Sequence, residues 1–146
     1  MDERDIANCA FRHITRTSRA VTSAYDRALK PSGLTANQFN VIATLHQAGD
    51  QNVKGLAELV GMDSSTVPRV LAPLVQRRLV KVASGDDGRE RWIGLTGRGR
   101  TRFEQARPLW QAAQDAVIQH LGAGAWGATL GKLREVRKSL RSIEQG

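Results

Sequence analysis

The order of segments in residues 54–95 constrains the fold most strongly, because two short helical segments precede two strand-like segments. The segment 54–60, KGLAELV, has apolar residues at helical spacing and ends at Gly61, a residue type that favours helix ends. Asp63 or Ser64 is placed to cap a following helix, whose apolar face is Val67, Val70, Leu71, Leu74 and Val75. Two short helices joined by residues 61–63 predict a helix-turn-helix.

The two strand-like segments are residues 79–84, LVKVAS, and 91–95, RWIGL, on either side of a turn rich in glycine and charge. Their alternation of apolar and polar side chains predicts a two-stranded hairpin with a charged tip. An isolated hairpin is marginally stable in water, so it has to pack on the helices through residues such as Leu79, Val82 and Ile93. A helix-turn-helix followed by such a hairpin is a winged helix-turn-helix.

Long amphipathic segments flank this lobe. Residues 4–30 carry an apolar stripe at helical spacing, and Pro31-Ser32-Gly33 ends the predicted helix. Thr35 is expected to open a second helix, with Gln38 as its capping-box partner and Phe39, Ile42 and Leu45 buried. A long helix is predicted over 96–121, and Gly122 and Gly124 separate it from a last helix with Leu130, Leu133, Val136, Leu140 and Ile143. The predicted fold class is mainly α, with a small β-hairpin wing.

The charge of the chain is uneven. Its 146 residues carry 22 Lys and Arg against 14 Asp and Glu, a net charge of +8. Residues 51–103 alone hold ten basic and five acidic side chains, and most of the basic ones are arginine. An excess of arginine in the winged lobe is typical of a surface that faces nucleic-acid phosphates, although a merely solvated basic surface has the same composition.

Other function classes lack their signals. His13, His46 and His120 lie on different predicted helices without metal-ligand spacing, and the sequence has no P-loop, nucleophile elbow or dinucleotide fingerprint. We therefore expect that the protein is not an enzyme and that it binds no metal and no cofactor. A single cysteine, no membrane-length apolar run and no apolar export signal predict a cytoplasmic protein that does not contact membranes.

Three fragments resemble the multiple-antibiotic-resistance regulator (MarR) family of winged-helix transcription factors. They are DGR at 87–89 with LT at 95–96, LAELVGMDSSTVPRVLAPL at 56–74, and SRAVTSAYDRALKPSGLTANQF at 18–39. The resemblance covers nearly the whole chain. It implies one domain over 1–146, in which 35–99 form the DNA-binding lobe and 5–34 and 100–146 form dimerisation helices.

The resemblance also implies a homodimer that binds a palindromic operator in double-stranded DNA and is released by a small ligand or by oxidation. We expect a repressor.

Two positions depart from the family pattern. Many relatives have Ser or Thr at the position of Pro68 and Gly at the position of Arg78. Because a non-glycine residue at positive φ is costly, the exit of the recognition helix is expected to differ at Arg78. Pro73 inside this helix predicts a bend.

The candidate DNA-binding residues fall into two groups. In the recognition helix, Ser64, Ser65 and Thr66 are placed to meet phosphates or base edges, with Pro68 beside them and Arg69 placed to bind a guanine. In the wing, Arg89 is the candidate for the minor groove, and Asp87 is expected to hold an arginine side chain in position. Arg91 and Lys54 are further candidates for phosphate contacts. The alternative interpretation makes the hydroxyls helix caps and Arg69 a solvated charge.

A small-molecule effector, aromatic or phenolic, is expected between the dimer helices and the winged lobe. His13 and Arg16 are neighbours on the first helix, and Arg16 is placed to pair with a carboxylate between the apolar walls Phe39, Ile42 and Trp110. The alternative for His13 and Arg16 is a plain helix surface or an interface salt bridge.

Two other functions remain open. Cys9, with His13 and Arg12 nearby, suggests a regulator that senses oxidants through this thiol, although a lone cysteine is more often a buried, inert one. A charge of +8 on a winged lobe would also suit an architectural protein that coats DNA with little sequence preference.

Overall fold

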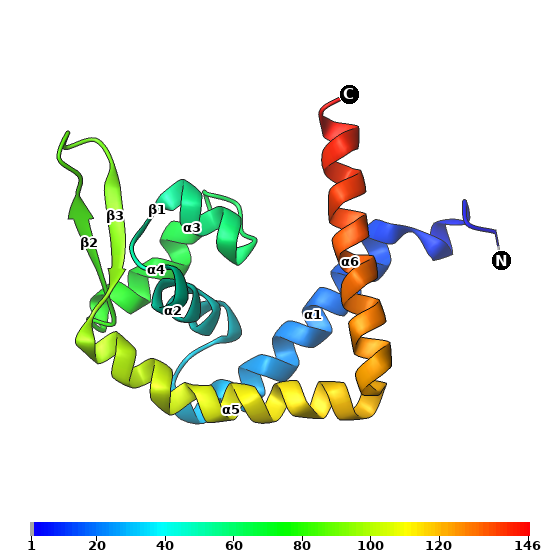
Figure 1. Ribbon diagram of the computed structural model, residues 1–146, viewed down its shortest axis with the longest axis horizontal. Coiled ribbons are helices and arrows are strands. Elements are labelled where there is room, and N and C mark those ends of the chain that lie inside the picture. The colour runs from blue at the N-terminus through cyan, green and yellow to red at the C-terminus, as the bar shows by residue number, and fades with distance from the viewer. Residues whose placement is uncertain (1) are drawn as a thin grey trace. The chain divides into compact units, whose positions relative to one another are not determined.

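The computed structural model describes residues 2–146. The chain divides into two compact units, one ending at Trp110 and the other comprising Gln111–Gly146. Within these residues the structure contains six α-helices, two short 3₁₀ turns and a small three-stranded antiparallel sheet, which confirms the predicted mainly helical class with a β wing (Figure 1). No helix among residues 2–146 is long and apolar enough to cross a membrane.

The first helix, α1 (Ala10–Leu29), begins later than the predicted residue 4. A separate 3₁₀ turn, Ile6–Asn8, precedes it, and the Asp5 carboxylate accepts a hydrogen bond from the backbone N–H of Ala7 (2.8 Å). Cys9 then has extended backbone angles, so the two helical segments are not continuous. The extended residue Cys9 therefore separates the N-terminal 3₁₀ turn from α1.

The second helix, α2 (Ala36–Ala48), begins as predicted. Thr35 accepts a hydrogen bond from the backbone of Gln38, and the Gln38 side chain accepts one from the backbone of Thr35, which confirms the capping box. The Asp26 carboxylate of α1 also accepts a hydrogen bond from the backbone N–H of Ala36 (2.7 Å). This negative charge at the positive end of α2 connects the two helices.

The helix-turn-helix consists of α3 (Val53–Val60) and α4 (Val67–Gln76). Gly61 ends α3 in the left-handed conformation, as predicted. The predicted cap of α4 at Asp63 or Ser64 is wrong, because Thr66 is its N-cap. Residues 64–66 form a turn, and Pro68 lacks the N–H that a helix starting at Ser64 would need for its first hydrogen bonds. The helix continues through Pro73 to Gln76.

The exit of α4 is a Schellman motif with an arginine where glycine is usual. The N–H of Arg78 bonds the carbonyl of Val75, and that of Leu79 bonds the carbonyl of Leu74 (both 2.9 Å). Arg78 itself has a φ of +58°. The expected change of geometry at Arg78 does not occur: the residue adopts the strained conformation instead, and the Thr96 hydroxyl donates to its carbonyl oxygen (2.7 Å).

The sheet contains one strand more than predicted. The wing strands β2 (Val80–Ser84) and β3 (Arg91–Leu95) form the expected hairpin, and β1 (Gln51–Asn52) pairs with the other edge of β3 in the order β1-β3-β2. Gln51 lies opposite Ile93, and Asn52 lies opposite Trp92. The wing is therefore joined through β1 to the start of α3.

A single apolar core holds the winged lobe together. It is formed by residues of the end of α1, α2, α3, α4, the sheet and the start of α5 (Gly97–Leu121). Its fully buried side chains include Leu29, Ile42, Leu56, Leu74, Leu79 and Ile93. The predicted buried positions Phe39, Ile42 and Leu45 all belong to this core.

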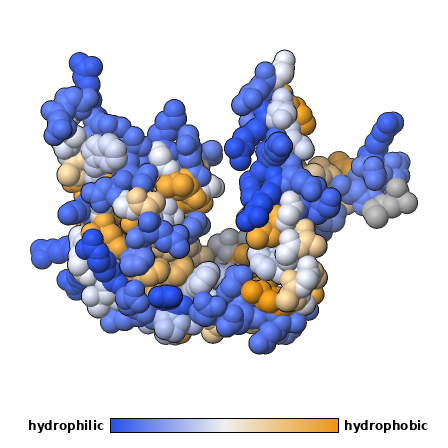
Figure 2. All heavy atoms as spheres, viewed as in Figure 1, coloured by the Kyte–Doolittle hydropathy of each residue, from blue (hydrophilic) through white to orange (hydrophobic). Residues whose placement is uncertain are grey.

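The last helix, α6 (Ala123–Glu144), begins after Gly122 and buries none of its residues. Val136, Leu140 and Ile143 are 36%, 52% and 74% exposed. Figure 2 shows hydrophobic residues among the hydrophilic ones on this helix. The N-terminal segment has the same property, with Ile6 and Phe11 78% and 79% exposed. Both segments therefore expose apolar side chains to solvent in a single chain.

Candidate nucleic-acid interface

The N-terminal end of α4 presents polar groups to solvent. Ser64 and Ser65 are exposed and Thr66 is half-buried, and the turn is held by hydrogen bonds from the N–H groups of Thr66 and Val67 to the carbonyl of Asp63. Because the N-terminus of a helix carries a partial positive charge, this end of α4 favours an anion such as a phosphate.

The exposed face of α4 also carries Arg69, which lies a few residues into the helix. Its side chain has no ion-pair partner among residues 2–146. Pro68 is exposed in the first turn, where the missing N–H costs no hydrogen bond. The predicted recognition-helix residues are thus brought together at one end of α4, and Arg69 is available to an outside partner.

At the wing tip, the Asp87 carboxylate caps its own turn. One of its oxygens accepts hydrogen bonds from the backbone N–H groups of Arg89 (3.0 Å) and Glu90 (3.3 Å). These bonds lower the pKa of Asp87 below its ordinary value of 3.8. The expectation that Asp87 holds an arginine side chain is not met in this structure, because the carboxylate bonds nearby backbone instead. The Arg89 and Arg91 side chains are exposed.

Sequence reasoning missed the contact that anchors the wing. The Asn52 side-chain amide donates to the Glu90 carboxylate (2.6 Å), while its carbonyl oxygen caps α3 by accepting from the N–H of Gly55 (2.7 Å). Asn52 therefore joins the base of the wing tip to the first turn of α3, where Lys54 is exposed. An asparagine just before a helix is a capping signal that the sequence does contain.

A groove of about 440 Å³ separates the recognition helix from the wing. Pro68 of α4 and Arg91 of β3 both line it, so the structure brings these two predicted residues together. Most of the remaining lining is apolar and includes Val53, Leu71, Val75, Val82 and Ile93.

The candidate effector residues separate into three groups. His13 and Arg16 are exposed on α1, and the His13 ring lies 2.6 Å from the carbonyl oxygen of Ala7. Phe39 and Ile42 are core residues, 6% and 0% exposed. Trp110 lines a cavity of about 260 Å³ and stacks on Phe39, with ring centroids 6.0 Å apart.

The rest of this cavity, which we call the Trp110 cavity, is lined by Val21, Thr22, Tyr25, Leu29, Ala36, Asn37 and Asn40. Its polar groups are hydroxyls and amides, and burial raises the pKa of the Tyr25 phenol. The structure does not bring His13 or Arg16 into its lining.

Cys9 is half-buried at the N-cap of α1. The His13 ring, which was expected to act on this thiol, contacts the Ala7 carbonyl instead. No group of three metal-ligating side chains occurs within the described residues 2–146. Nothing in this region favours the oxidant-sensing alternative.

Comparisons with known proteins agree with this architecture. A model of the MarR family matches residues 32–90. The helix-turn-helix-type transcriptional regulator YhbI of Bacillus subtilis is 26% identical over 100% of this chain and 96% of its own length.

Solved structures of the same fold include Bordetella bronchiseptica BpsR, whose DNA binding is regulated by 6-hydroxynicotinic acid (23% identity, 86% of this chain and 96% of BpsR, TM-score 0.78). The Mycobacterium tuberculosis transcriptional regulator MosR is 30% identical, over 94% of this chain and 99% of MosR, with a TM-score of 0.84. A structure of MosR in complex with DNA is 35% identical, over 88% of this chain and 97% of the MosR chain, with a TM-score of 0.73. With its winged helix-turn-helix, its match to the family model and this identity to MosR, the chain belongs to the MarR family of transcriptional regulators.

Proposed function

We propose that the protein is a repressor that binds a palindromic operator as a homodimer. The observation that supports this most is the pairing of an open, positively polarised end of α4 with an arginine-bearing wing anchored beside it through Asn52. In this arrangement α4 enters the major groove and the wing tip reaches the adjacent minor groove. MosR, a relative with the same fold, has been seen in complex with DNA.

Each predicted DNA-binding residue has a role in this proposal. Ser64, Ser65 and Thr66 donate to phosphates or base edges, and Arg69 binds a guanine. Arg89 enters the minor groove, while Asp87 shapes the wing turn. The exposed cations Lys54 and Arg91, with Pro68 between α4 and the wing, complete the surface.

Uncovered apolar side chains support the proposed homodimer. Ile6 and Phe11 at the N-terminal end, and Leu140 and Ile143 on α6, are each more than half exposed. Apolar residues repeated along a helix without a partner in the same chain mark an interaction surface. A second copy of this chain is the partner that makes one recognition helix available for each half of a palindrome.

We propose that the protein has no catalytic activity and that an effector controls its DNA binding. The Trp110 cavity suits a neutral phenol, because aromatic walls flank polar groups without charge, the hydroxyls of Thr22 and Tyr25 and the amides of Asn37 and Asn40. BpsR, a protein of the same fold, responds to a small aromatic acid, but its 23% identity supports only the shared fold.

The DNA-binding proposal predicts that Arg89→Ala weakens operator binding by about tenfold or more, because a guanidinium in a narrow minor groove interacts strongly with its negative potential. Fluorescence anisotropy on a selected inverted repeat at physiological salt measures the change. Arg107→Ala, which removes the same charge from an exposed position on α5, should leave the affinity nearly unchanged. Equal losses in the two variants, or none in Arg89→Ala, contradict the role of the wing.

The effector proposal predicts that phenol releases the DNA and that Asn37→Leu weakens this response by about tenfold, because leucine replaces a polar group at the cavity wall. Gln47→Leu is the control, since Gln47 is exposed on α2 away from the cavity. The anisotropy of bound DNA is measured during a phenol titration. A response that is the same in Asn37→Leu and in the control places the effector elsewhere.

A further inference from the structure

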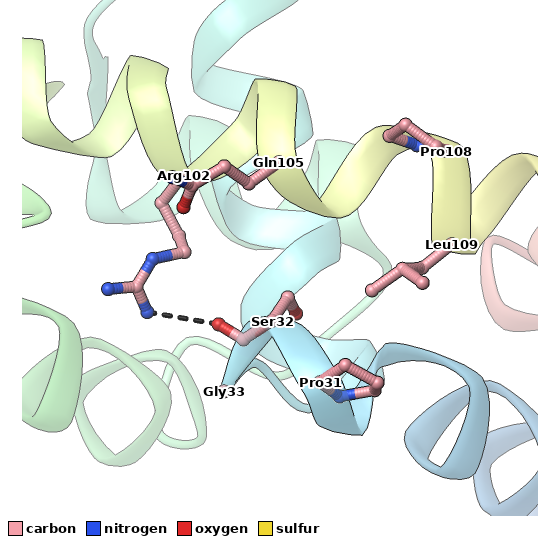
Figure 3. A pocket seen from close by; sticks show the side chains of 7 residues that line it. All are labelled: Pro31, Ser32, Gly33, Arg102, Gln105, Pro108 and Leu109. Carbon is pink, nitrogen blue, oxygen red and sulfur yellow. Dashed lines mark hydrogen bonds between the residues drawn. The ribbon is translucent and has the colours of Figure 1, made fainter.

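A second cavity, of about 530 Å³, lies between the turn after α1 and the first half of α5 (Figure 3). Its two ends differ in chemistry. Arg102 and Gln105 line it together with Ser32 and Gly33 of the turn, whereas Pro31, Pro108 and Leu109 form an aliphatic wall. Its volume is in the range that small-molecule sites occupy, and its lining combines a few polar groups with apolar surface. We call it the Arg102 cavity.

Two guanidinium groups hold the turn at this cavity. Arg102 of α5 donates to the carbonyl oxygen of Ser32 (3.0 Å), and Arg77 donates to that of Gly33 (2.9 Å). Arg77 is the C-cap residue of α4. The turn between α1 and α2 is therefore tied to the end of the recognition helix and to α5 by two arginines.

The positive charge here has no carboxylate to balance it. Arg77, Arg98 and Arg102 form no ion pair with any carboxylate among residues 2–146. Burial lowers the pKa of Arg102, and the neighbouring charges of Arg77 and Arg98 lower it further. An anion would be attracted by these guanidinium groups.

This positive cluster is separate from the proposed DNA-binding surface. Strand β3 runs from Arg91, next to the charged tip, to Leu95 at the base of the wing, and α5 begins only after it (Figure 1). Part of the basic excess in residues 51–103 thus lies away from the wing tip, with Arg102 in the lining of the cavity and Arg77 bonded to the turn that lines it.

We propose that the Arg102 cavity binds a small aliphatic carboxylate, whose charged group pairs with the Arg102 guanidinium and whose chain lies against Pro31, Pro108 and Leu109. The lining contains no aromatic ring, which distinguishes it from the Trp110 cavity with its neutral polar groups. The carboxylate competes with the Ser32 carbonyl for Arg102. Binding therefore alters the turn that Arg77 connects to the recognition helix.

The test is a titration of the DNA-free protein with sodium hexanoate at constant ionic strength, monitored at each step by two-dimensional ¹H–¹⁵N NMR. The expected result is a saturable shift of the amide signals of Ser32, Gly33 and Gln105. Hexanamide, which has the same chain without the charge, and acetate, which has the charge without the chain, should each bind about tenfold more weakly or worse. Because no DNA is present, failure here leaves the proposed operator binding untouched.

Variants separate the Arg102 cavity from the general positive charge of the surface. Arg102→Gln should weaken hexanoate binding by about tenfold or more, whereas Arg100→Gln, which removes a charge from an exposed position on the same helix, should leave it nearly unchanged. Arg102→Lys keeps the charge and should retain part of the affinity. The wild-type titration decides the matter if Arg102→Gln does not fold.

Three results overturn the proposal. The first is a shift that does not saturate, or that is centred on Asn37 and Asn40 of the Trp110 cavity. The second is acetate or inorganic phosphate binding as tightly as hexanoate, which would mean nonspecific anion adsorption. The third is equal binding by Arg102→Gln and Arg100→Gln.

Discussion

At the scale of single residues, the wing tip depends on the ionised side chain of Asp87. Its carboxylate accepts two backbone hydrogen bonds, so the charged form is favoured in the folded wing and the pKa is lowered. A group whose pKa is lowered by folding contributes stability above its unfolded pKa, and this contribution is lost as the pH falls through the folded value. Asp87 therefore keeps the wing turn ordered at neutral pH.

This gives a prediction for the pH dependence of the wing. The midpoint of Asp87 titration, followed by NMR through the amide shifts of Arg89 and Glu90, should lie below the ordinary value of 3.8. Both amide signals should change together, since both N–H groups bond the same oxygen. A midpoint at or above 3.8 would show that these hydrogen bonds do not form in solution.

Arg78 shows how much of a single residue can be read from sequence. Its position after the recognition helix is one where glycine is usual, and the sequence predicts a cost there. In the structure Arg78 has a φ of +58°, which costs a non-glycine residue roughly 1–2 kcal/mol. What the sequence does not reveal is the compensation: the Thr96 hydroxyl bonds the Arg78 carbonyl from a residue distant in the chain.

At the scale of elements, the join between α5 and the wing depends on a close backbone approach. Thr96 caps α5 by accepting from the N–H of Gly99 (3.0 Å) and is itself bonded to Leu79 through its backbone N–H (3.2 Å). A side chain at Gly99 would meet the carbonyl oxygen of Leu79 and a methyl group of Leu95. The first turn of α5 thus packs on the sheet only because position 99 has no Cβ atom.

We therefore expect Gly99→Ala to lower the free energy of unfolding by about 1–3 kcal/mol, since the new methyl group has to displace backbone atoms. Gly97→Ala is the matched control on the same helix, because its methyl group would enter open space and alanine favours helix. Urea unfolding followed by circular dichroism measures both. If both variants are equally stable, the close approach of α5 to Leu79 is not present.

Some helices and strands could be predicted from the sequence better than others. The capping box at Thr35, the stop at Gly61 and the wing strands follow from local chemistry and agree with the structure. Strand β1 is only two residues long and has no alternation to detect, and it forms because β3 offers an open edge. The late start of α4 could have been predicted from Pro68. Because proline lacks an N–H, it outweighs the preference of Asp63 and Ser64 for a capping position.

The candidate site was predicted in the same uneven way. Residues next to one another in the chain, such as the group at the start of α4, could be found from the sequence. Contacts across the chain, such as Asn52 with Glu90 or Arg102 with Ser32, could not, because their spacing is set by the fold. The effector residues illustrate the limit: Phe39 and Ile42 have the apolar character of a pocket wall but belong to the core.

At the scale of the whole molecule, the proposed DNA recognition depends on assembly. The chain carries a complete winged lobe, yet α6 buries none of its residues and the N-terminal segment exposes Ile6 and Phe11. A single winged lobe reads one half-site, so specificity for a palindrome requires two copies held at a fixed spacing. The proposed dimer would therefore account both for the unpartnered apolar helices and for the proposed operator binding.

The measurement that tests this most directly is competition binding between an inverted repeat selected from random duplexes and a duplex of the same composition with one half-site scrambled. If a dimer binds a palindromic operator, two chains should bind each duplex, and the intact repeat should be preferred over bulk DNA by about 10³-fold, with a clear loss on scrambling. A monomeric chain that binds intact, scrambled and random duplexes with equal affinity would contradict it.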